Sequence, residues 1–282
     1  MLRKKNQLNN WKYFNMAKTL QLISKEKLIA TFKEIESRGW IEVPKKRKLN
    51  DGSVGNLLED LLGIPENNLP IPNAAEWELK AQRAETSSLV TLCHQEPSPR
   101  AVSLVSEMLL PNYGWPHSLA GKKYPIGEMS FRATLNSTTF TDRGFKVNVN
   151  RKDERVEIIF DSSKCDERHS EWLNSVKNKV GLGPLKILPY WGFNDLYTKV
   201  GTKLINCFFV QAESKRENGK VYFHYNNVLM LKSVDKTKFI DSIENGKIYI
   251  DFDARSGHNH GTKFRIKSKD IPLLYAEAIR VV

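Results

Sequence analysis

Long apolar stretches are missing from this sequence. No run approaches the roughly 18 consecutive apolar residues that an α-helix needs to cross a bilayer. The basic N-terminal segment, MLRKKNQLNNWKYF, is followed by no hydrophobic region and by no small-residue cleavage site, so it is not expected to be a signal peptide. A membrane protein and a secreted protein are therefore both disfavoured.

Cysteine pairs and phosphate-binding loops are also lacking. The three cysteines, Cys93, Cys165 and Cys207, are widely separated and share no metal-ligand spacing. Reduced thiols in a cytoplasmic protein are the expectation from this usage. No GxGxxG, Walker-type or Gly-Lys-Ser motif occurs, which disfavours a nucleotide-binding enzyme.

Acidic residues are outnumbered by basic ones. Lysine and arginine total 44 against 32 aspartates and glutamates, which gives a formal net charge of +12. Such an excess favours a polyanionic partner, because each phosphate that the protein neutralises releases condensed counterions. Many basic proteins bind no nucleic acid, so the charge alone does not decide between a nucleic-acid partner and none.

The apolar pattern predicts a mixed α/β or α+β fold around a mixed sheet. Ser24 is a candidate N-cap for a first helix that ends before Gly39, and a second helix is expected at 54–62. Further strands are expected at 76–81, in SLVTLCH, KLINCFFVQAES and KVYFHYNNVLML, and in two strand pairs, FKVNVNRKDERVEIIFD and GKIYIDFDARSGHNHGTKFRI.

A carboxylate and an ammonium lie two residues apart on the strand expected at 76–81. Alternation directs Trp77 and Leu79 to the core and leaves Glu78 and Lys80 together on the opposite face. Phosphodiester hydrolysis needs such a pair, with Glu78 binding Mg²⁺ and Lys80 polarising the attacking water. Glu59, on the preceding helix, is a candidate further ligand. A solvated sheet face is the commoner explanation of a lone Glu-x-Lys.

A second candidate site is the segment GHNHGTKFRI. Arg265 is suited to bidentate contact with guanine, and His258, Asn259 and His260 are suited to neighbouring base edges in the major groove. A metal site at the two histidines lacks a further ligand at suitable spacing. An exposed polar loop with no ligand is the remaining alternative.

These motifs resemble those of a known family. The runs DGSVGNLLEDLLGIPENNLPIPNAAEWELKAQRAETSSLVTLCHQEP and SIENGKIYIDFDARSGHNHGTKFRI resemble the MvaI/BcnI group of Type II restriction endonucleases, which are related to MutH within the PD-(D/E)xK nucleases. The resemblance extends from about residue 23 to the C-terminus. It implies a restriction-endonuclease-like core, with a central mixed sheet flanked by helices and two lobes forming a DNA cleft.

The resemblance also implies residue roles. Glu59, Glu78 and Lys80 match the helix glutamate, the metal-binding acid and the catalytic lysine of the family. The implied DNA-binding residues lie on the flanking segments and in the C-terminal loop and strand. They are Arg83, His94, Arg255, His258, Asn259, His260 and Arg265.

The implied activity is Mg²⁺-dependent cleavage of duplex DNA within a short CC-N-GG site by a monomer. A cognate DNA methyltransferase is the implied functional partner in the cell. In chain order we expect a basic arm over 1–20, a catalytic lobe over 21–110, and the remaining core with the DNA-recognition lobe over 111–282.

Asn73 departs from the family pattern. The resemblance places a metal-binding aspartate at this position, and an amide supplies no negative charge there. Three explanations are open: a deliberately inactivated variant, a natural loss of activity, or compensation by Glu76. The alternative functions are accordingly an inactive sequence-specific DNA-binding protein and a MutH-like nicking endonuclease.

Overall fold

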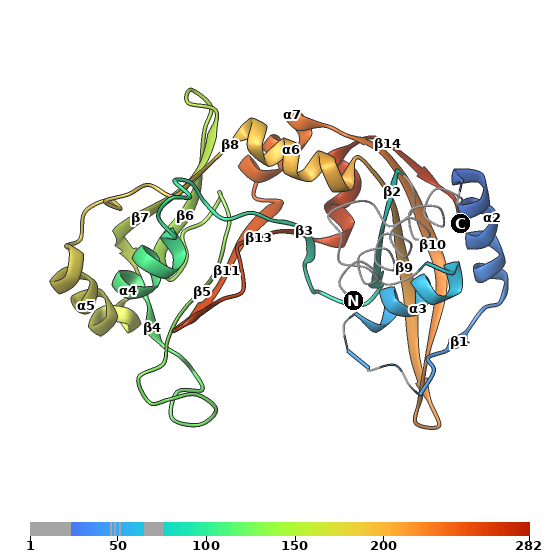
Figure 1. Ribbon diagram of the computed structural model, residues 1–282, viewed down its shortest axis with the longest axis horizontal. Helices are drawn as coiled ribbons and strands as arrows, with labels where there is room; N and C mark the ends of the chain where they lie inside the picture. Colours follow the sequence, from blue (N-terminus) through green and yellow to red (C-terminus); the bar gives the residue numbers. More distant parts are fainter. Residues whose placement is uncertain (1–23, 46, 48, 51, 65–75) are drawn as a thin grey trace, which may run out of the picture. The chain divides into compact units, whose positions relative to one another are not determined.

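The computed structural model describes residues 24–45, 47, 49, 50, 52–64 and 76–282. Figure 1 shows the course of the chain. The chain divides into two compact units, each built from separate segments. Unit 1 takes in the described part of 1–88 together with 201–234 and 275–282, and unit 2 takes in 89–200 and 235–274. No described helix combines the length and apolarity that crossing a membrane requires.

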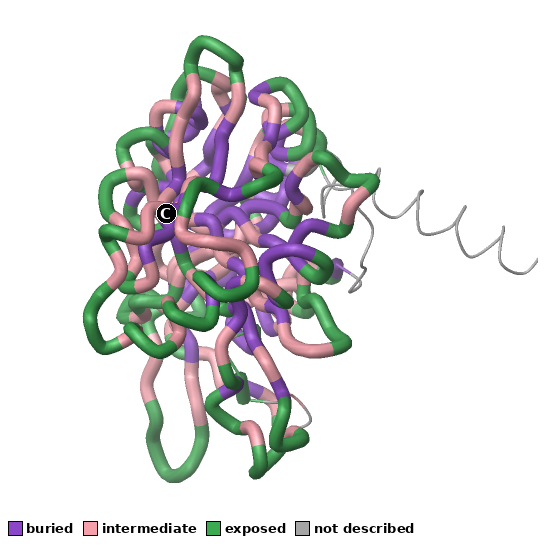
Figure 2. The backbone as a smooth tube through the Cα atoms, turned by 90° about the vertical axis from the view of Figure 1, so that its left-hand side faces the viewer, coloured by how far each residue is buried: buried purple, intermediate pink, exposed green. Residues whose placement is uncertain are grey.

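Unit 1 contains a mixed five-stranded sheet. Strand β2 pairs with β9 in parallel, and all the other pairings in this sheet are antiparallel. The order is β1 (Ile41–Glu42), β10 (Lys220–Val234), β9 (Asn206–Glu217) and β2 (Trp77–Arg83), and β14 (Tyr275–Arg280) also pairs with β10. The turn between β9 and β10 is exposed, the first half of β9 is largely buried, and buried and partly exposed residues alternate along β10 (Figure 2).

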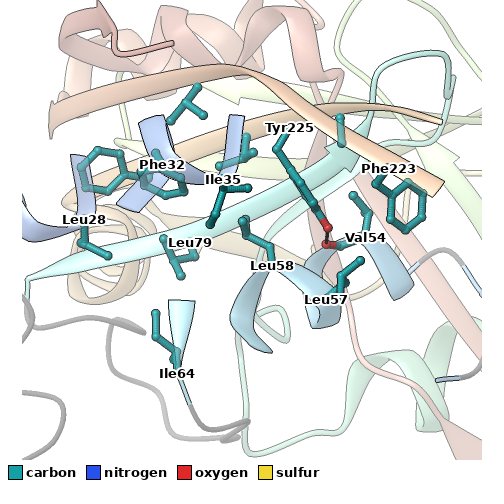
Figure 3. Packing of buried hydrophobic residues seen from close by; sticks show 14 of the residues in the cluster. Leu28, Phe32, Ile35, Val54, Leu57, Leu58, Ile64, Leu79, Phe223 and Tyr225 are labelled. Carbon is teal, nitrogen blue, oxygen red and sulfur yellow. Dashed lines mark hydrogen bonds between the residues drawn. The ribbon is translucent and has the colours of Figure 1, made fainter. Parts of the chain in front are cut away.

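Two helices cover one face of this sheet. Helix α2 (Lys25–Ser37) begins at Ser24, whose Oγ accepts a hydrogen bond from the amide of Lys27, as the N-cap pattern predicts. Helix α3 (Ser53–Leu62) ends at Gly63, which adopts the left-handed conformation that glycine favours. The apolar faces of both helices pack against the sheet (Figure 3). The helices contribute Leu28, Phe32, Ile35, Leu57 and Leu58, and the strands contribute Leu79 and Phe223.

Unit 2 contains two further sheets. In the larger one, the order is β3 (Val90–His94), β13 (Lys263–Ile266), β11 (Ile248–Arg255), β5 (Met129–Leu135) and β4 (Trp115–Pro116), and β12 (His258–Asn259) also pairs with β11. The smaller sheet has the order β6 (Arg143–Asn150), β7 (Arg155–Cys165) and β8 (Tyr190–Gly192).

An aromatic cluster and several short helical segments complete unit 2. An aromatic cluster that includes Phe131, Phe145 and Phe160 links its two sheets. The helical segments are η1 (Val105–Leu109), α4 (Leu110–Tyr113), η2 (Glu167–His169), α5 (Ser170–Val180), α7 (Lys236–Glu244) and η3 (Ser268–Leu274), while α6 (Phe193–Leu204) runs across the division between the units.

The expected mixed α/β fold is confirmed. The two predicted helices are α2 and α3, and the predicted strand that ends at His94 is β3. Both predicted strand pairs exist, as β6 with β7 and as β11 with β13. The segment KLINCFFVQAES differs at its start, because Lys203 and Leu204 belong to α6 and the strand begins at Asn206.

Candidate active site and recognition loop

Glu78 and Lys80 form a close ion pair on β2. The Nζ of Lys80 lies 2.6 Å from Oε1 of Glu78. Trp77 and Leu79 point into the core of unit 1, as alternation along the strand predicts. Glu78 is only 1% exposed, so the pair does not belong to a solvated sheet face. A buried carboxylate is costly, and its position beside a lysine is typical of a functional pair.

Cys207 and Tyr275 are buried neighbours of Glu78 in this pair. Cys207 on β9 is the register partner of Glu78 and is almost fully buried. Burial raises the pKa of the Cys207 thiol to about 12, and the side chain of Tyr275 forms a hydrogen bond with it. Burial also raises the pKa of Tyr275, and the charge of Glu78 adds to this shift. Neither residue stood out in the sequence, because their proximity to Glu78 arises from strand pairing.

Glu59 is placed by helix α3, which packs against β2. The hydroxyl of Tyr225 donates a hydrogen bond of 2.8 Å to the carbonyl oxygen of Val54 and ties this helix to β10 (Figure 3). Glu59 is partly exposed. Glu76 is exposed at the start of β2, and Asn73 lies outside the described residues.

The donor chemistry of this site suits Mg²⁺. Carboxylate oxygens are the ligands that Mg²⁺ prefers, and one or two of them suffice, because the ion keeps several of its waters. Within the ranges that the structure describes, no three His, Cys, Asp or Glu side chains gather into a complete metal cage. Glu78 and Glu59 are the described carboxylates to which the sequence resemblance assigns such an ion.

Unit 2 brings the other candidate residues to the β3–β13–β11 part of its sheet. His94 ends β3 opposite Lys263 of β13. Arg265 donates from Nη1 to Asp251 of β11 at 3.1 Å and from Nη2 to the carbonyl oxygen of Leu89 at 2.9 Å. The guanidinium plane of Arg265 is thereby held in one orientation on the sheet.

The loop after β11 is organised by its own polar side chains and by Glu96 from a distant segment. Nε2 of His258 lies 3.3 Å from Nδ1 of His260, and the two rings meet edge to face. Glu96 accepts from the amide of Thr262 at 2.7 Å and from Nδ2 of Asn259 at 3.3 Å. The histidines and the asparagine are exposed, so this loop presents donors and acceptors on a braced backbone.

Arg255 and Arg83 are positioned differently. Arg255 donates from Nη1 to Glu128 at 3.0 Å, and its guanidinium lies 4.6 Å from the centre of the Tyr124 ring. Arg83 ends β2 in unit 1, on the same strand as Glu78, whereas all the other candidate DNA-binding residues lie in unit 2.

Several carboxylates that hold the candidate recognition residues in place were missed in the sequence. Glu96, Glu128 and Asp251 each contact one of those residues from a distant segment. The alternating acids of IDFDAR on β11 were the available signal for Asp251, since strand pairing turns them towards basic neighbours. No local pattern marks Glu96 or Glu128.

Comparisons with known proteins decide the family. The model of the MvaI/BcnI restriction endonuclease family matches residues 29–275, which include β2, α3 and the recognition loop. The chain belongs to this family. It is therefore a restriction endonuclease by family, and the expected resemblance is confirmed. A search of curated protein sequences gives no match.

Solved structures agree on the fold. The chain is similar to restriction endonuclease MvaI in a complex with its cognate DNA substrate, with a TM-score of 0.70, 24% identity, and coverage of 92% of this chain and 99% of that one. It is also similar to MvaI in the absence of DNA, with a TM-score of 0.50, 22% identity, and coverage of 90% and 98%.

Proposed function

We propose that this protein is a Mg²⁺-dependent type II restriction endonuclease that hydrolyses both strands of duplex DNA within a short CC-N-GG-like site. The observation that carries the proposal is the buried ion pair between Glu78 and Lys80 on β2. Family membership supplies the reaction class, and the chemistry of the pair fits it.

Each residue of the candidate active site has a separate role in hydrolysis. Glu78 and Glu59 hold the metal ion, and Lys80 orients and polarises the water that attacks the phosphorus. When bound, Mg²⁺ supplies charge neutralisation and lowers the pKa of a coordinated water. The ammonium of Lys80, fixed 2.6 Å from Glu78, also places a positive charge where the pentavalent phosphorane accumulates negative charge.

In this proposal, Asn73 makes the chain cleave DNA slowly. An amide oxygen is a weaker ligand for Mg²⁺ than a carboxylate and leaves the site with one negative charge fewer. DNA binding is expected to persist, because phosphate and base contacts lie elsewhere. Glu76 is exposed at the start of β2 and is the candidate for partial compensation.

Sequence recognition is assigned to unit 2. Arg265, Arg255 and His94 supply the base and phosphate contacts on the sheet, and His258, Asn259 and His260 supply those of the loop. Arg83 adds a contact beside the cleavage site. The proposal further has the enzyme act as a monomer in the cytoplasm, with a cognate methyltransferase protecting the same sites on the host DNA.

Asn73 also favours a second candidate, a sequence-specific DNA-binding protein without cleavage activity. The third candidate, a MutH-like nicking enzyme, predicts that one strand alone is cut. These functions share the fold and differ in their products, so a cleavage assay separates them.

The test uses a supercoiled plasmid that carries CC-N-GG sites, incubated with the unaltered chain and with Asn73→Asp. We expect Asn73→Asp to raise the rate of linear product formation many-fold in Mg²⁺ and to give none in a chelator. Asn218→Asp, the same change in the exposed β9–β10 turn, is the control and should leave the rate unchanged.

Each other product pattern points to a different conclusion. Open circles that persist at saturating enzyme favour the nickase. Specific binding by both chains without cleavage favours the DNA-binding protein. An unaltered chain that already cuts as fast as Asn73→Asp overturns the assignment of position 73 to the metal site.

A further inference from the structure

A pocket in unit 2 lies outside the candidate recognition loop. It has a volume of about 390 Å³ and opens between β4, β5 and the start of β6. Its polar lining comes from Arg132, Thr134, Thr141, Asp142 and Arg143, and Trp115 forms an aromatic wall. None of these residues belongs to the metal site or to the loop described above.

Arg143 is the unusual member of this lining. Its guanidinium carbon lies 4.1 Å from the centre of the Trp115 ring and 5.5 Å from that of Trp172. The side chain is only 18% exposed, and burial lowers the pKa of its guanidinium. Its Nε is buried without a partner, and among the described residues no acceptor forms a hydrogen bond with its guanidinium. Arginine carries five N–H donors, and groups this buried are normally satisfied.

The neighbouring carboxylate does not supply the missing acceptor. Asp142 accepts from Nη2 of Arg168 at 2.8 Å and lies 2.8 Å from Nε2 of His169. Its distance to Nη1 of Arg143 is 3.7 Å, too long for a hydrogen bond. Asp142 is thus hydrogen-bonded to Arg168 and His169, and its longer ion pair with Arg143 leaves the N–H donors of Arg143 without a hydrogen-bond acceptor among the described residues.

The rest of the lining also suits an anion. Arg132 adds a second positive charge, which Asp253 holds through Nε at 2.8 Å while the side chain stays more than half exposed. The pocket lining carries two arginines and one carboxylate, Asp142, which is also hydrogen-bonded to Arg168 from outside the lining. A planar guanidinium stacked on an indole is well preorganised for bidentate contact with phosphate oxygens.

The position of the pocket indicates where such a phosphate comes from. Arg132 on β5 is the register partner of Asp253 on β11, and Ser130 on β5 is the partner of Arg255. The pocket therefore lies beside the strand that carries a candidate base-reading arginine, within one and the same unit. DNA read from β11 has its backbone within reach of β5.

We propose that this pocket binds a backbone phosphate of the DNA, with Arg143 as the principal donor and Arg132 as the second. This inference rests on the proposed function, because the ligand is the same duplex that the enzyme cleaves. A contact of this kind orients the duplex and carries no base preference. It adds a phosphate clamp to the set of DNA-binding residues.

The test is the salt dependence of DNA binding, measured by fluorescence anisotropy without divalent metal. The probes are a CC-N-GG duplex and an unrelated duplex of the same length. Loss of one phosphate contact makes the slope of log K against log[salt] shallower by about 0.9 and weakens binding to both duplexes on the order of tenfold. We expect this result for Arg143→Gln.

Arg151→Gln is the matched control. It removes the same charge from an exposed position in unit 2 where Asp241 and Glu244 already engage the side chain, so it should leave the slope nearly unchanged. Thermal unfolding shows whether Arg143→Gln folds. If it does not, Arg143→Lys decides, because it keeps the charge and loses the planar fork. Several-fold weaker binding of both duplexes supports the clamp, and binding equal to that of the unaltered chain overturns it.

Failure of the clamp and failure of the proposed function give different results. If the unaltered chain binds the CC-N-GG duplex and Arg143→Gln keeps the full slope, the clamp alone is wrong. If the unaltered chain binds no duplex, both are wrong. A titration with inorganic phosphate at constant ionic strength, followed by tryptophan fluorescence, distinguishes the two sources of phosphate. Saturable binding of the free ion at micromolar concentration would overturn the assignment to DNA.

Discussion

The ammonium of Lys80 lies 2.6 Å from Oε1 of Glu78, whose side chain is 2% exposed, whereas the side chain of Lys80 is 23% exposed. Removing both charges from water costs several kcal/mol per ion, and their attraction offsets that cost only in part. Such a pair is weak evidence for a contribution to stability. Its placement at the centre of the family motif therefore favours a role in chemistry.

Removal of Lys80 should expose the cost of the buried carboxylate. Lys80→Ala removes the ammonium that lies 2.6 Å from the buried carboxylate of Glu78, and we expect the free energy of unfolding to fall by about 3–5 kcal/mol, measured by urea titration at neutral pH. The double variant Glu78→Leu, Lys80→Met replaces the pair with apolar side chains and should recover most of the loss. A single variant as stable as the unaltered chain would show that Glu78 is better solvated than its burial indicates. In the Asn73→Asp background, either change should abolish cleavage.

Alkaline pH should destabilise unit 1 through Cys207. The folded chain keeps the thiol protonated up to a pKa of about 12, whereas the unfolded chain releases the proton near its usual value of 9. The unfolded state thus binds fewer protons between these values, so stability falls as pH rises from about 9 to about 12. Cys207→Ala should make this fall shallower by up to about 1.4 kcal/mol per pH unit, measured by urea unfolding at successive pH values. An identical slope in both proteins would contradict the burial of this thiol.

The hydrogen bond between Tyr225 and Val54 should stabilise the packing of α3 against the sheet. Tyr225→Phe keeps the ring in the core and removes the hydroxyl that donates to the carbonyl oxygen of Val54. We expect a loss of about 0.5–1.5 kcal/mol in the free energy of unfolding, the usual net value of such a bond. Tyr222→Phe on the same strand is the control, because Tyr222 is not buried. Equal losses of unfolding free energy in the two variants would show that the buried hydroxyl of Tyr225 contributes no more than the hydroxyl of Tyr222.

Arg265 should be needed for specific binding rather than for binding in general. Arg265→Lys keeps the charge beside Asp251 but loses the bidentate fork. We expect binding to the CC-N-GG duplex to weaken by about 1–3 kcal/mol, with little change for an unrelated duplex. The difference from Arg143→Gln, which should weaken both, separates base reading from phosphate contact. Equal weakening of the two duplexes by Arg265→Lys would reassign this arginine to the backbone.

Local patterns in the sequence account for much of unit 1. The cap at Ser24, Gly39 after α2 and the alternation around Glu78 all predict what forms, because each depends on neighbours within a few residues. Helix α5 and strand β14 were not predicted, since α5 buries few apolar residues and β14 is mostly exposed. The expected division of the chain followed residue order, whereas the compact units are assembled from separated segments.

The sequence by itself determined the family, the placement of Glu78 and Lys80 together on β2 and the polar loop at His258–His260, because each depends on a short motif that can be recognised without its surroundings. Tertiary structure alone decided that Glu78 is buried, that Cys207 and Tyr275 stand behind it, and that Arg143 lies stacked and without an acceptor beside Trp115. The burial of a charged group and the partners that it finds depend on residues far apart in the chain. Strand register and helix packing bring those residues together, and no local sequence pattern encodes either of them.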